Sequence, residues 1–329
     1  MDKEFHYNIT GIIARRAGFT EEEALTIAHA SQLVDDNDAL CTIHDPTSGI
    51  EYEVYISQTM DILKPKRELM RTYPIFHFLP GYPMANSARR SDGKMHILMT
   101  TPGSALAHQV MIAARDDNSP FHLHRMGVAA HAFVDTWAHQ NFVGWYDGIN
   151  GEDMNLFPNI GHADFIHHPD WVGHRWDDNR IINSQINNNH RFLDAAQQLF
   201  LEFSFYTKNK GASLWPALQK DLQGAMGSVF SGEKLQGKDA RLKAYDKLFH
   251  MPEYNPQAWF ESTVETEVRG LPDKFMPSLT IFKDYYKWKD NWQNSDWYLF
   301  QEAAKAHQAF CMTELELLFK QMNVELSDH

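Results

Sequence analysis

Cysteine and long apolar runs are scarce in this sequence. Only Cys41 and Cys311 occur among 329 residues, which excludes a disulfide framework and makes a reducing cytoplasm the expected compartment. No stretch approaches the roughly 18 consecutive apolar residues of a membrane-spanning helix. The first residues also lack the apolar segment after positive charge that marks a signal peptide. We therefore expect a cytoplasmic protein without a transmembrane segment.

Positive charge is also in deficit. The chain has 30 Lys and Arg against 43 Asp and Glu, a formal net charge of −13 with neutral histidine. Nucleic acids and anionic membranes bind to clustered Lys and Arg, so neither is expected as the main partner. A small-molecule substrate is expected instead. Phosphate esters stay open as that substrate, because a bound divalent cation would reverse the local field.

Several common catalytic motifs are missing as well, among them the Walker A loop and the GxGxxG, GxSxG and HExxH patterns. What the chain does have is 43% hydrophobic and 13% aromatic residues, enough for a sizeable core without a low-complexity tail. The chemistry must therefore be sought in polar residues placed on an ordinary globular framework.

Apolar residues at helical spacing dominate the chain. Helices are predicted over residues 4–17, from Thr20 to about 35, and over 104–115, 120–143, 184–207, 213–230 and 295–323. A β-hairpin is predicted near 39–59, around the turn DPTSG, and a further strand pair near HILMTT. The predicted fold is mainly α, a multi-helix bundle with a small β-hairpin insertion. We expect a helical metal-site domain at residues 1–210 with a helical C-terminal portion, residues 211–329, packed on it. The two parts could also form one single domain.

Histidine is the residue type in excess. The chain has 18 histidines, and 12 of them lie between His77 and His190. The sharpest pattern is HAFVDTWAHQNF, in which His131, Asp135 and His139 follow at steps of four and share one helical face. Their neighbours are apolar, and a buried carboxylate needs compensation, so a divalent metal is favoured over a structural Asp–His pair.

Further candidate ligands lie on other segments. His6 is on the first predicted helix, and Asp35 and Asp36 end the second, where two acids oppose the helix dipole unless a cation compensates them. His77 lies in the apolar, turn-rich segment IFHFLPG. The helix NNNHRFLDAAQQLF repeats the His/carboxylate spacing with His190 and Asp194. The loop after residue 160 has four histidines that could supply a lid, a ligand or a general acid: His162, His167, His168 and His174.

The order of these motifs resembles the zinc-dependent phospholipase C and P1 nuclease superfamily. Its members are all-helical enzymes that hold several metals with His and Asp from separate helices and hydrolyse phosphate esters. The resemblance implies a metal-hydrolase-like bundle, with His190 and Asp194 standing where that superfamily has HxxxE. The ligands that it implies in this chain are His6, Asp35 or Asp36, His77, His131, Asp135 and His139.

Three segments also look similar to an uncharacterised bacterial family of metal-hydrolase-like proteins: EFHYNITGIIARRAG, ASQLVDDN and HAFVDTWAHQNFVG. One departure concerns the amino terminus, which binds metal in the mature enzymes of the superfamily. Here Met1 and several residues precede His6, so this ligand is not expected. One or two ions are therefore expected rather than three.

The predicted function is metal-dependent hydrolysis, of phosphate esters by resemblance, through a metal-activated water. Zinc is the first expectation for the divalent ion, with manganese or iron as alternatives. Asp35 or Asp36 could bridge two ions or act as general base, and His162 could act as a proton donor. Two other classes stay open. One is a non-heme Fe(II) oxygenase of the 2-His-1-carboxylate type, and the other is a binding protein with a structural metal.

Overall fold

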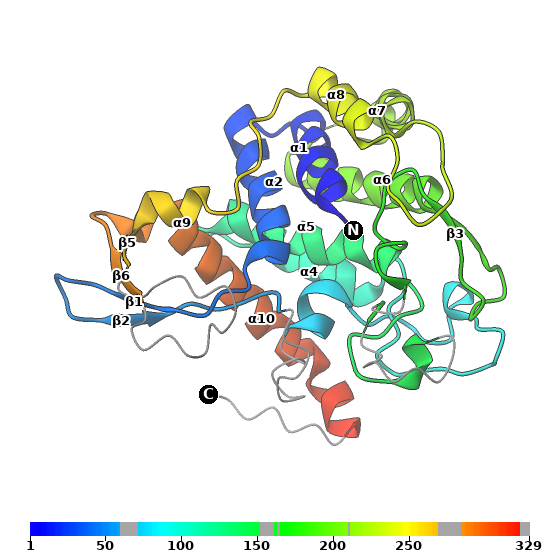
Figure 1. Ribbon diagram of the computed structural model, residues 1–329, viewed down its shortest axis with the longest axis horizontal. Coiled ribbons are helices and arrows are strands. Elements are labelled where there is room, and N and C mark those ends of the chain that lie inside the picture. The colour runs from blue at the N-terminus through cyan, green and yellow to red at the C-terminus, as the bar shows by residue number, and fades with distance from the viewer. Residues whose placement is uncertain (60–71, 152–160, 163–164, 210, 269–283, 323–329) are drawn as a thin grey trace.

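The computed structural model describes residues 1–59, 72–151, 161–162, 165–209, 211–268 and 284–322. Residues 163–164 of the loop after residue 160 and the last residue of the predicted C-terminal helix lie outside these ranges. The described chain is mainly helical, as predicted (Figure 1). Its helices are the π-helical η1 (Glu4–Ile9) and η2 (Tyr73–His77), the 3₁₀ helices η3 (Asn86–Ala88), η4 (Gly148–Asn150) and η7 (Trp292–Asn294), and the α-helices α1 (Thr10–Ala17), α2 (Glu21–Asp36), α4 (Ala105–Arg115), α5 (His122–Ala138), α6 (Asn188–Tyr206), α7 (Gly211–Met226), α8 (Lys238–Leu248), α9 (Ala258–Thr263) and α10 (Asp296–Gln321).

Local sequence signals account for the ends of several helices. Thr20 and Glu23 form a capping box at the start of α2, with each side chain accepting from the other's backbone N–H. Gly18 ends α1 with φ of 113°, a left-handed conformation that favours glycine. Ser295 is the N-cap of α10, since its hydroxyl accepts from the N–H of Tyr298.

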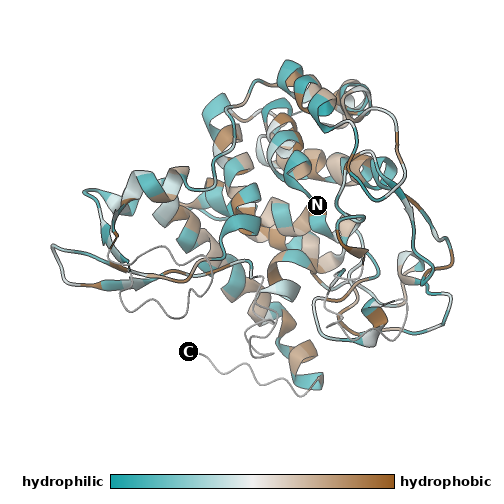
Figure 2. Ribbon diagram, in the orientation of Figure 1, coloured by the Kyte–Doolittle hydropathy of each residue, from teal (hydrophilic) through white to brown (hydrophobic). Residues whose placement is uncertain are grey.

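Helix α5 lies at the centre of the fold and packs against α2, α4, α6 and α10 (Figure 1). All of its residues from Met126 to Ala138 are buried. Its contact with α2 is unusually close at Gly127, where an added Cβ would lie 2.5 Å from the carbonyl oxygen of Ile27. The outer helices α7 and α8 show both hydropathy colours, as expected of helices that bury one face (Figure 2).

A four-stranded sheet lies at one end of the molecule, in the order β2-β1-β6-β5 (Figure 1). Strands β1 (Thr42–His44) and β2 (Glu51–Glu53) form a hairpin within the predicted 39–59 segment. Strand β1 pairs in parallel with β6 (Tyr285–Trp288), which is antiparallel to β5 (Val264–Glu267). A separate hairpin joins β3 (Arg175–Asp177) and β4 (Gln185–Asn187). Elements from both sides of residue 210 thus share one sheet.

Two predictions of local structure differ from what is found. Residues 96–101 do not form a strand pair; Met99 and Thr100 make isolated bridges with Val143 and Pro80. The first predicted helix, 4–17, begins with the π-helical turn η1 before it continues as α1. Wider π-helical turns change the direction of side chains and are frequent at functional sites. This one contains His6.

Candidate metal centre

Helix α5 carries His131 and Asp135 one turn apart on its buried face. His131 is 0% and Asp135 is 1% exposed, and the His131 Nε2 lies 3.2 Å from the Asp135 Oδ2. The helix ends at Ala138, earlier than the predicted 120–143, so His139 is its C-cap. The N–H of His139 still donates to the Asp135 carbonyl, and its Nδ1 lies 3.6 Å from the Asp135 Oδ2. The stripe predicted from the sequence therefore converges.

Three other elements bring predicted residues to Asp135. The turn η1 places the His6 Nε2 at 3.1 Å from the Asp135 Oδ1, and η2 places the His77 Nδ1 at 3.6 Å from its Oδ2. Asp35, in the last turn of α2, has its Oδ1 at 3.7 Å from both the His77 Nδ1 and the His131 Nε2. We call the five residues His6, Asp35, His77, His131 and Asp135 the first group.

A second group lies beside the first and consists of His139, His162 and Asp170. The Asp170 Oδ1 is 3.2 Å from the His139 Nε2, and its Oδ2 is 3.3 Å from the His162 Nε2. One ligand atom from each of the three residues lies within 4.8 Å of the other two. Gly161, at φ of 55°, lets the chain pass Phe78, where an added Cβ would lie 2.4 Å from the ring. That passage sets the position of His162.

Backbone carbonyl oxygens hold four of these imidazoles. The carbonyl oxygens of Ser57, Ser31, His77 and Ile166 lie 2.9, 2.8, 2.6 and 2.8 Å from one ring nitrogen of His77, His131, His139 and His162, respectively. A carbonyl oxygen only accepts, so the bonded nitrogen donates and the other nitrogen of a neutral ring presents a lone pair. In each case that other nitrogen is the one that faces a carboxylate.

Several lone pairs of nitrogen and oxygen therefore face one another in the first group. The buried Oδ2 of Asp135 and both ring nitrogens of His6 have no hydrogen-bond partner among the described residues. The His131 Nε2 lies 3.1 Å from the His77 Nδ1, although each ring already donates from its other nitrogen to a carbonyl. Such an arrangement is repulsive unless a proton or a cation lies between the atoms.

The spacing fits a cation. Two ligand atoms at the roughly 2.1 Å His and carboxylate distances of zinc are about 3.4 Å apart in a tetrahedral site. The His131–Asp135 and His77–Asp135 distances of 3.2 and 3.6 Å bracket that value. In the second group the distances of 3.2 and 3.3 Å from Asp170 are close to it. Both groups therefore have the donor types and the spacing of a divalent metal site.

The comparisons with known proteins give one match. The profile of a family of unknown function, DUF6765, matches residues 1–315. The chain belongs to the DUF6765 family. Comparison with curated proteins gives no match, and neither does comparison with solved structures. Both histidine/aspartate groups lie within the part of this DUF6765 chain that the profile covers.

In this DUF6765 chain, burial and neighbouring charges lower the pKa of some members of the two groups and raise that of others. Burial would raise the pKa of Asp135, but the neighbouring His139, the Met1 amino group and His131 outweigh it and hold that pKa well below its usual range. Burial raises the pKa of Asp35. Burial lowers the pKa of His162 to about 4, which keeps its ring neutral and able to bind a cation at neutral pH.

The amino terminus departs from expectation. The Met1 amino group is buried, hydrogen-bonds to Asp135, and lies 3.3 Å from the Asp170 Oδ1. From the sequence, this group was not expected in the site, because Met1 and several residues precede His6. In the structure it lies between the first and second groups, near the centre of the view in Figure 1.

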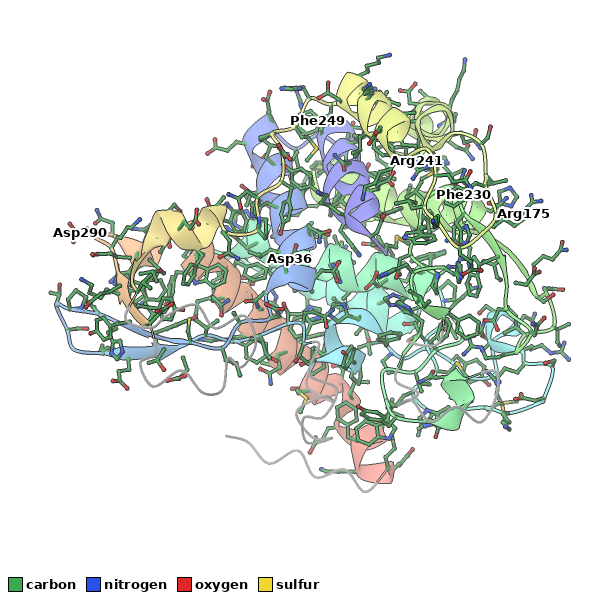
Figure 3. All side chains as sticks on the ribbon, viewed as in Figure 1. Asp36, Arg175, Phe230, Arg241, Phe249 and Asp290 are labelled. Atoms are coloured by element: carbon green, nitrogen blue, oxygen red, sulfur yellow. The ribbon has the colours of Figure 1, made fainter. Side chains whose placement is uncertain are left out.

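Three predicted site residues lie outside both groups. Asp36 follows Asp35 at the end of α2, where Figure 3 labels it. Its side chain accepts hydrogen bonds from Gln32 and Tyr254 instead of joining a group. His190 and Asp194 are exposed on α6 and do not lie beside the α5 stripe. The expectation that they stand where the superfamily has HxxxE is therefore not met, because their face of α6 turns outward.

The loop histidines divide in the same way. Only His162 joins a group, while His168 and His174 pair with each other at 2.8 Å and His167 is exposed. The residue that sequence reasoning missed is Asp170, which follows a Pro in the same loop. The residues just before Asp170 form turns rather than a helix or strand, so no periodic pattern singled this residue out.

Proposed function

We propose that this DUF6765 chain is a metal-dependent hydrolase of phosphate esters that holds two divalent ions, zinc first, one in each group. The observation that carries the proposal is the convergence of carbonyl-anchored imidazoles on the Asp135 carboxylate, whose Oδ2 has no hydrogen-bond partner among the described residues. An ion bound there supplies Lewis acidity and lowers the pKa of a coordinated water.

The residues of the chain divide the remaining work. His77, His131 and Asp135 would hold the first ion, and His139, His162 and Asp170 the second. The Asp35 side chain is 25% exposed, whereas that of Asp135 is 1% exposed. Asp35 therefore faces the solvent side of the first group, and its raised pKa suits a carboxylate that accepts a proton from attacking water.

Two features favour this proposal over the alternatives. A non-heme Fe(II) oxygenase needs one facial set of two histidines and a carboxylate, but here a second histidine/carboxylate group lies next to the first. Paired ions next to each other are typical of enzymes that hydrolyse phosphate esters. A purely structural metal would be closed off from ligands, whereas the Asp35 side chain of the first group is 25% exposed.

The test is a panel of phosphomonoesters and phosphodiesters, assayed with Zn, Mn, Fe and Ni. We expect hydrolysis that chelation abolishes. Asp35→Asn should lower kcat by about 100-fold or more, in line with the loss of a general base. Asp36→Asn is the matched control, because the neighbouring carboxylate lies outside both groups, and it should leave kcat within about twofold. An equal loss of kcat in the two variants would contradict the proposal, as would the absence of hydrolysis of every ester in the panel.

A further inference from the structure

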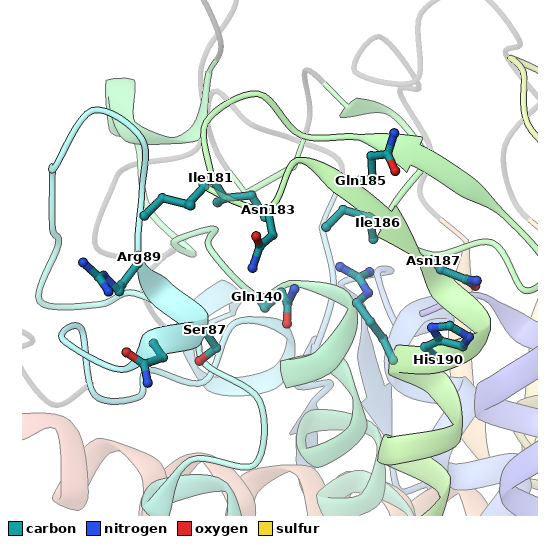
Figure 4. Close-up of a pocket in the computed structure, with 12 residues that line it drawn as sticks. Ser87, Arg89, Gln140, Ile181, Asn183, Gln185, Ile186, Asn187 and His190 are labelled. Carbon is teal, nitrogen blue, oxygen red and sulfur yellow. The ribbon is translucent and has the colours of Figure 1, made fainter.

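A polar pocket of about 510 Å³ lies between the loop after Ala85, the end of α5 and the start of α6 (Figure 4). Its volume is within the usual range of small-molecule sites. Five carboxamide side chains line it, and Figure 4 shows Asn183 and Gln140 facing each other across it. The five are Asn86, Gln140, Asn183, Gln185 and Asn187.

The charge of the pocket is opposite to that of the chain. Arg89, His190 and Arg191 line it, and none of its described lining residues is acidic, although the whole chain has a net charge of −13. The N-terminus of the 19-residue helix α6 opens at the same place and adds its positive dipole end, with no acid in the first turn. A site of this kind favours an anion.

Arg191 is the buried cation among the residues that line the pocket, whereas Arg89 and His190 are exposed. It is 9% exposed, and its Nη2 donates to the carbonyl oxygens of Ala138 and Pro169 at 3.1 and 3.0 Å. Its Nε–H is buried and has no hydrogen-bond partner among the described residues. Burial lowers its pKa to about 10, so the guanidinium stays charged at neutral pH. No carboxylate of the described chain forms an ion pair with it.

The pocket adjoins the second group. Gln140 follows His139 directly, and the two carbonyls that Arg191 binds belong to the residues before His139 and before Asp170. A phosphate at the Arg191 end would therefore lie next to the segments that position the second group. Hydroxyl groups of the same molecule would face the carboxamides, each of which can donate and accept.

We propose that this pocket binds the substrate, and that the substrate is a phosphorylated sugar or polyol whose hydroxyls pair with the carboxamides and whose phosphate lies at Arg191. As a statement about the substrate, this rests on the proposed function. As a statement about binding, it stands on the pocket alone, so the two can fail separately.

The experiment is calorimetric titration of the full chain, as purified and as His131→Ala, with glucose 6-phosphate, glucose and inorganic phosphate. We expect glucose 6-phosphate to bind at least about tenfold more tightly than either comparator, since it uses both the charged and the neutral hydrogen bonds. Binding should persist in His131→Ala, which carries no change in the pocket.

Pocket variants complete the test. Arg191→Met should weaken binding by about tenfold or more. Asn183→Ala and Gln140→Ala, which remove exposed or half-buried side chains and leave folding intact, should each weaken it by about three- to tenfold. Gln223→Ala on α7 is the matched control and should have no effect.

Binding that is lost in His131→Ala but unchanged in Asn183→Ala and Gln140→Ala would place the anion at the metal groups and overturn the pocket proposal. Equal affinity for inorganic phosphate and glucose 6-phosphate would overturn it too. Retained pocket binding without hydrolysis of any ester would instead count against the proposed function alone.

Discussion

The side chains of the two groups are held individually. Each of four histidines has one ring nitrogen fixed by a backbone carbonyl, so the direction of the other nitrogen is set before any ion binds. Ring nitrogens from three elements lie within 3.6 Å of the Asp135 carboxylate: His6 on η1, His77 on η2 and His131 on α5. Single substitutions should therefore affect one group more than the other.

The second group gives the first such prediction. Asp170→Asn should lower the metal content by about one ion per chain and leave the ion at His131 in place, because Asp170 contacts His139 and His162 but neither His77 nor His131. Elemental analysis of the purified variant measures this. Loss of all metal, or of none, would contradict a division into two ions.

The sequence was informative about this site where spacing follows a helical period. His131 and Asp135 share a face of α5 as predicted, and the residues predicted on other segments, His6, Asp35 and His77, lie beside them. Their roles as metal ligands stay a prediction. Asp170 was not foreseen, because a loop carries no periodic signal. The amino terminus was set aside because Met1 and several residues precede His6, but the structure places the Met1 amino group at Asp135. His190 and Asp194 have the four-residue spacing of a ligand pair, but they lie on the exposed face of α6.

Among the helices, the approach of α2 to α5 positions Asp35 against His131. The carbonyl of Ser31 on α2 accepts from the His131 ring at 2.8 Å, close to the point where Gly127 touches Ile27 and Ala30. Capping residues and small residues were readable from the sequence, whereas the π-helical turns η1 and η2 were not. Their extra residue per turn depends on what they pack against rather than on local propensity.

Gly127→Ala tests that contact. The new Cβ would lie 2.5 Å from backbone, so α2 must shift, and we expect a loss of about 2 kcal/mol in unfolding free energy, with weaker metal retention. Gly224→Ala on α7 is the matched control, since its Cβ would meet nothing within 4 Å, and it should stabilise the helix by up to about 1 kcal/mol. Denaturant titration of both variants decides. A neutral Gly127→Ala would contradict the close approach.

Helix α10 meets η2 through His307, which gives a pH prediction. His307 is buried, with its Nε2 3.0 Å from the Ile75 carbonyl oxygen, and burial lowers its pKa from 6.5 to about 4. The unfolded chain therefore takes up the proton first as the pH falls. This group costs nothing above pH 6.5, and between pH 6.5 and about 4 it progressively lowers the unfolding free energy, by about 3 kcal/mol at most.

The measurement is the pH dependence of unfolding in chelator, for the native chain and for His307→Gln. Glutamine can still donate to the Ile75 carbonyl but does not titrate. We expect a shallower loss of stability between pH 6.5 and 4 in the variant. Identical slopes would show that His307 does not contribute to the acid sensitivity.

At the scale of the whole molecule, distant parts of the chain close around the site. The parallel pair of β1 with β6 joins the first third of the chain to its last, and the contact of α10 with α5 joins the middle third to the last. Glu4, the first residue of η1, forms a buried ion pair with Arg241 on α8, which Figure 3 labels. No helix in the described ranges is long and apolar enough to cross a membrane. The strand, helix and ion pairs between distant parts of the chain could not be predicted from local sequence patterns.

Because both groups are assembled from many elements, the ions should stabilise the entire fold. Ligand binding to the native state alone adds about 4 kcal/mol at a thousandfold excess over Kd. Chelation should therefore lower Tm by several degrees, and readdition of zinc should restore it. Thermal scans at fixed protein concentration measure the shift. An unchanged Tm after verified removal of metal would contradict metal-linked folding.

The most direct test of the central claim is the metal content of His131→Ala beside that of His190→Ala and the native chain, purified without chelator and analysed by elemental spectrometry. His131 belongs to the first group, whereas His190 is exposed and outside both. The account predicts about two divalent transition metal ions per native chain and per His190→Ala chain, and a loss of at least one in His131→Ala. A native chain free of transition metal, or His131→Ala with undiminished content, would contradict it.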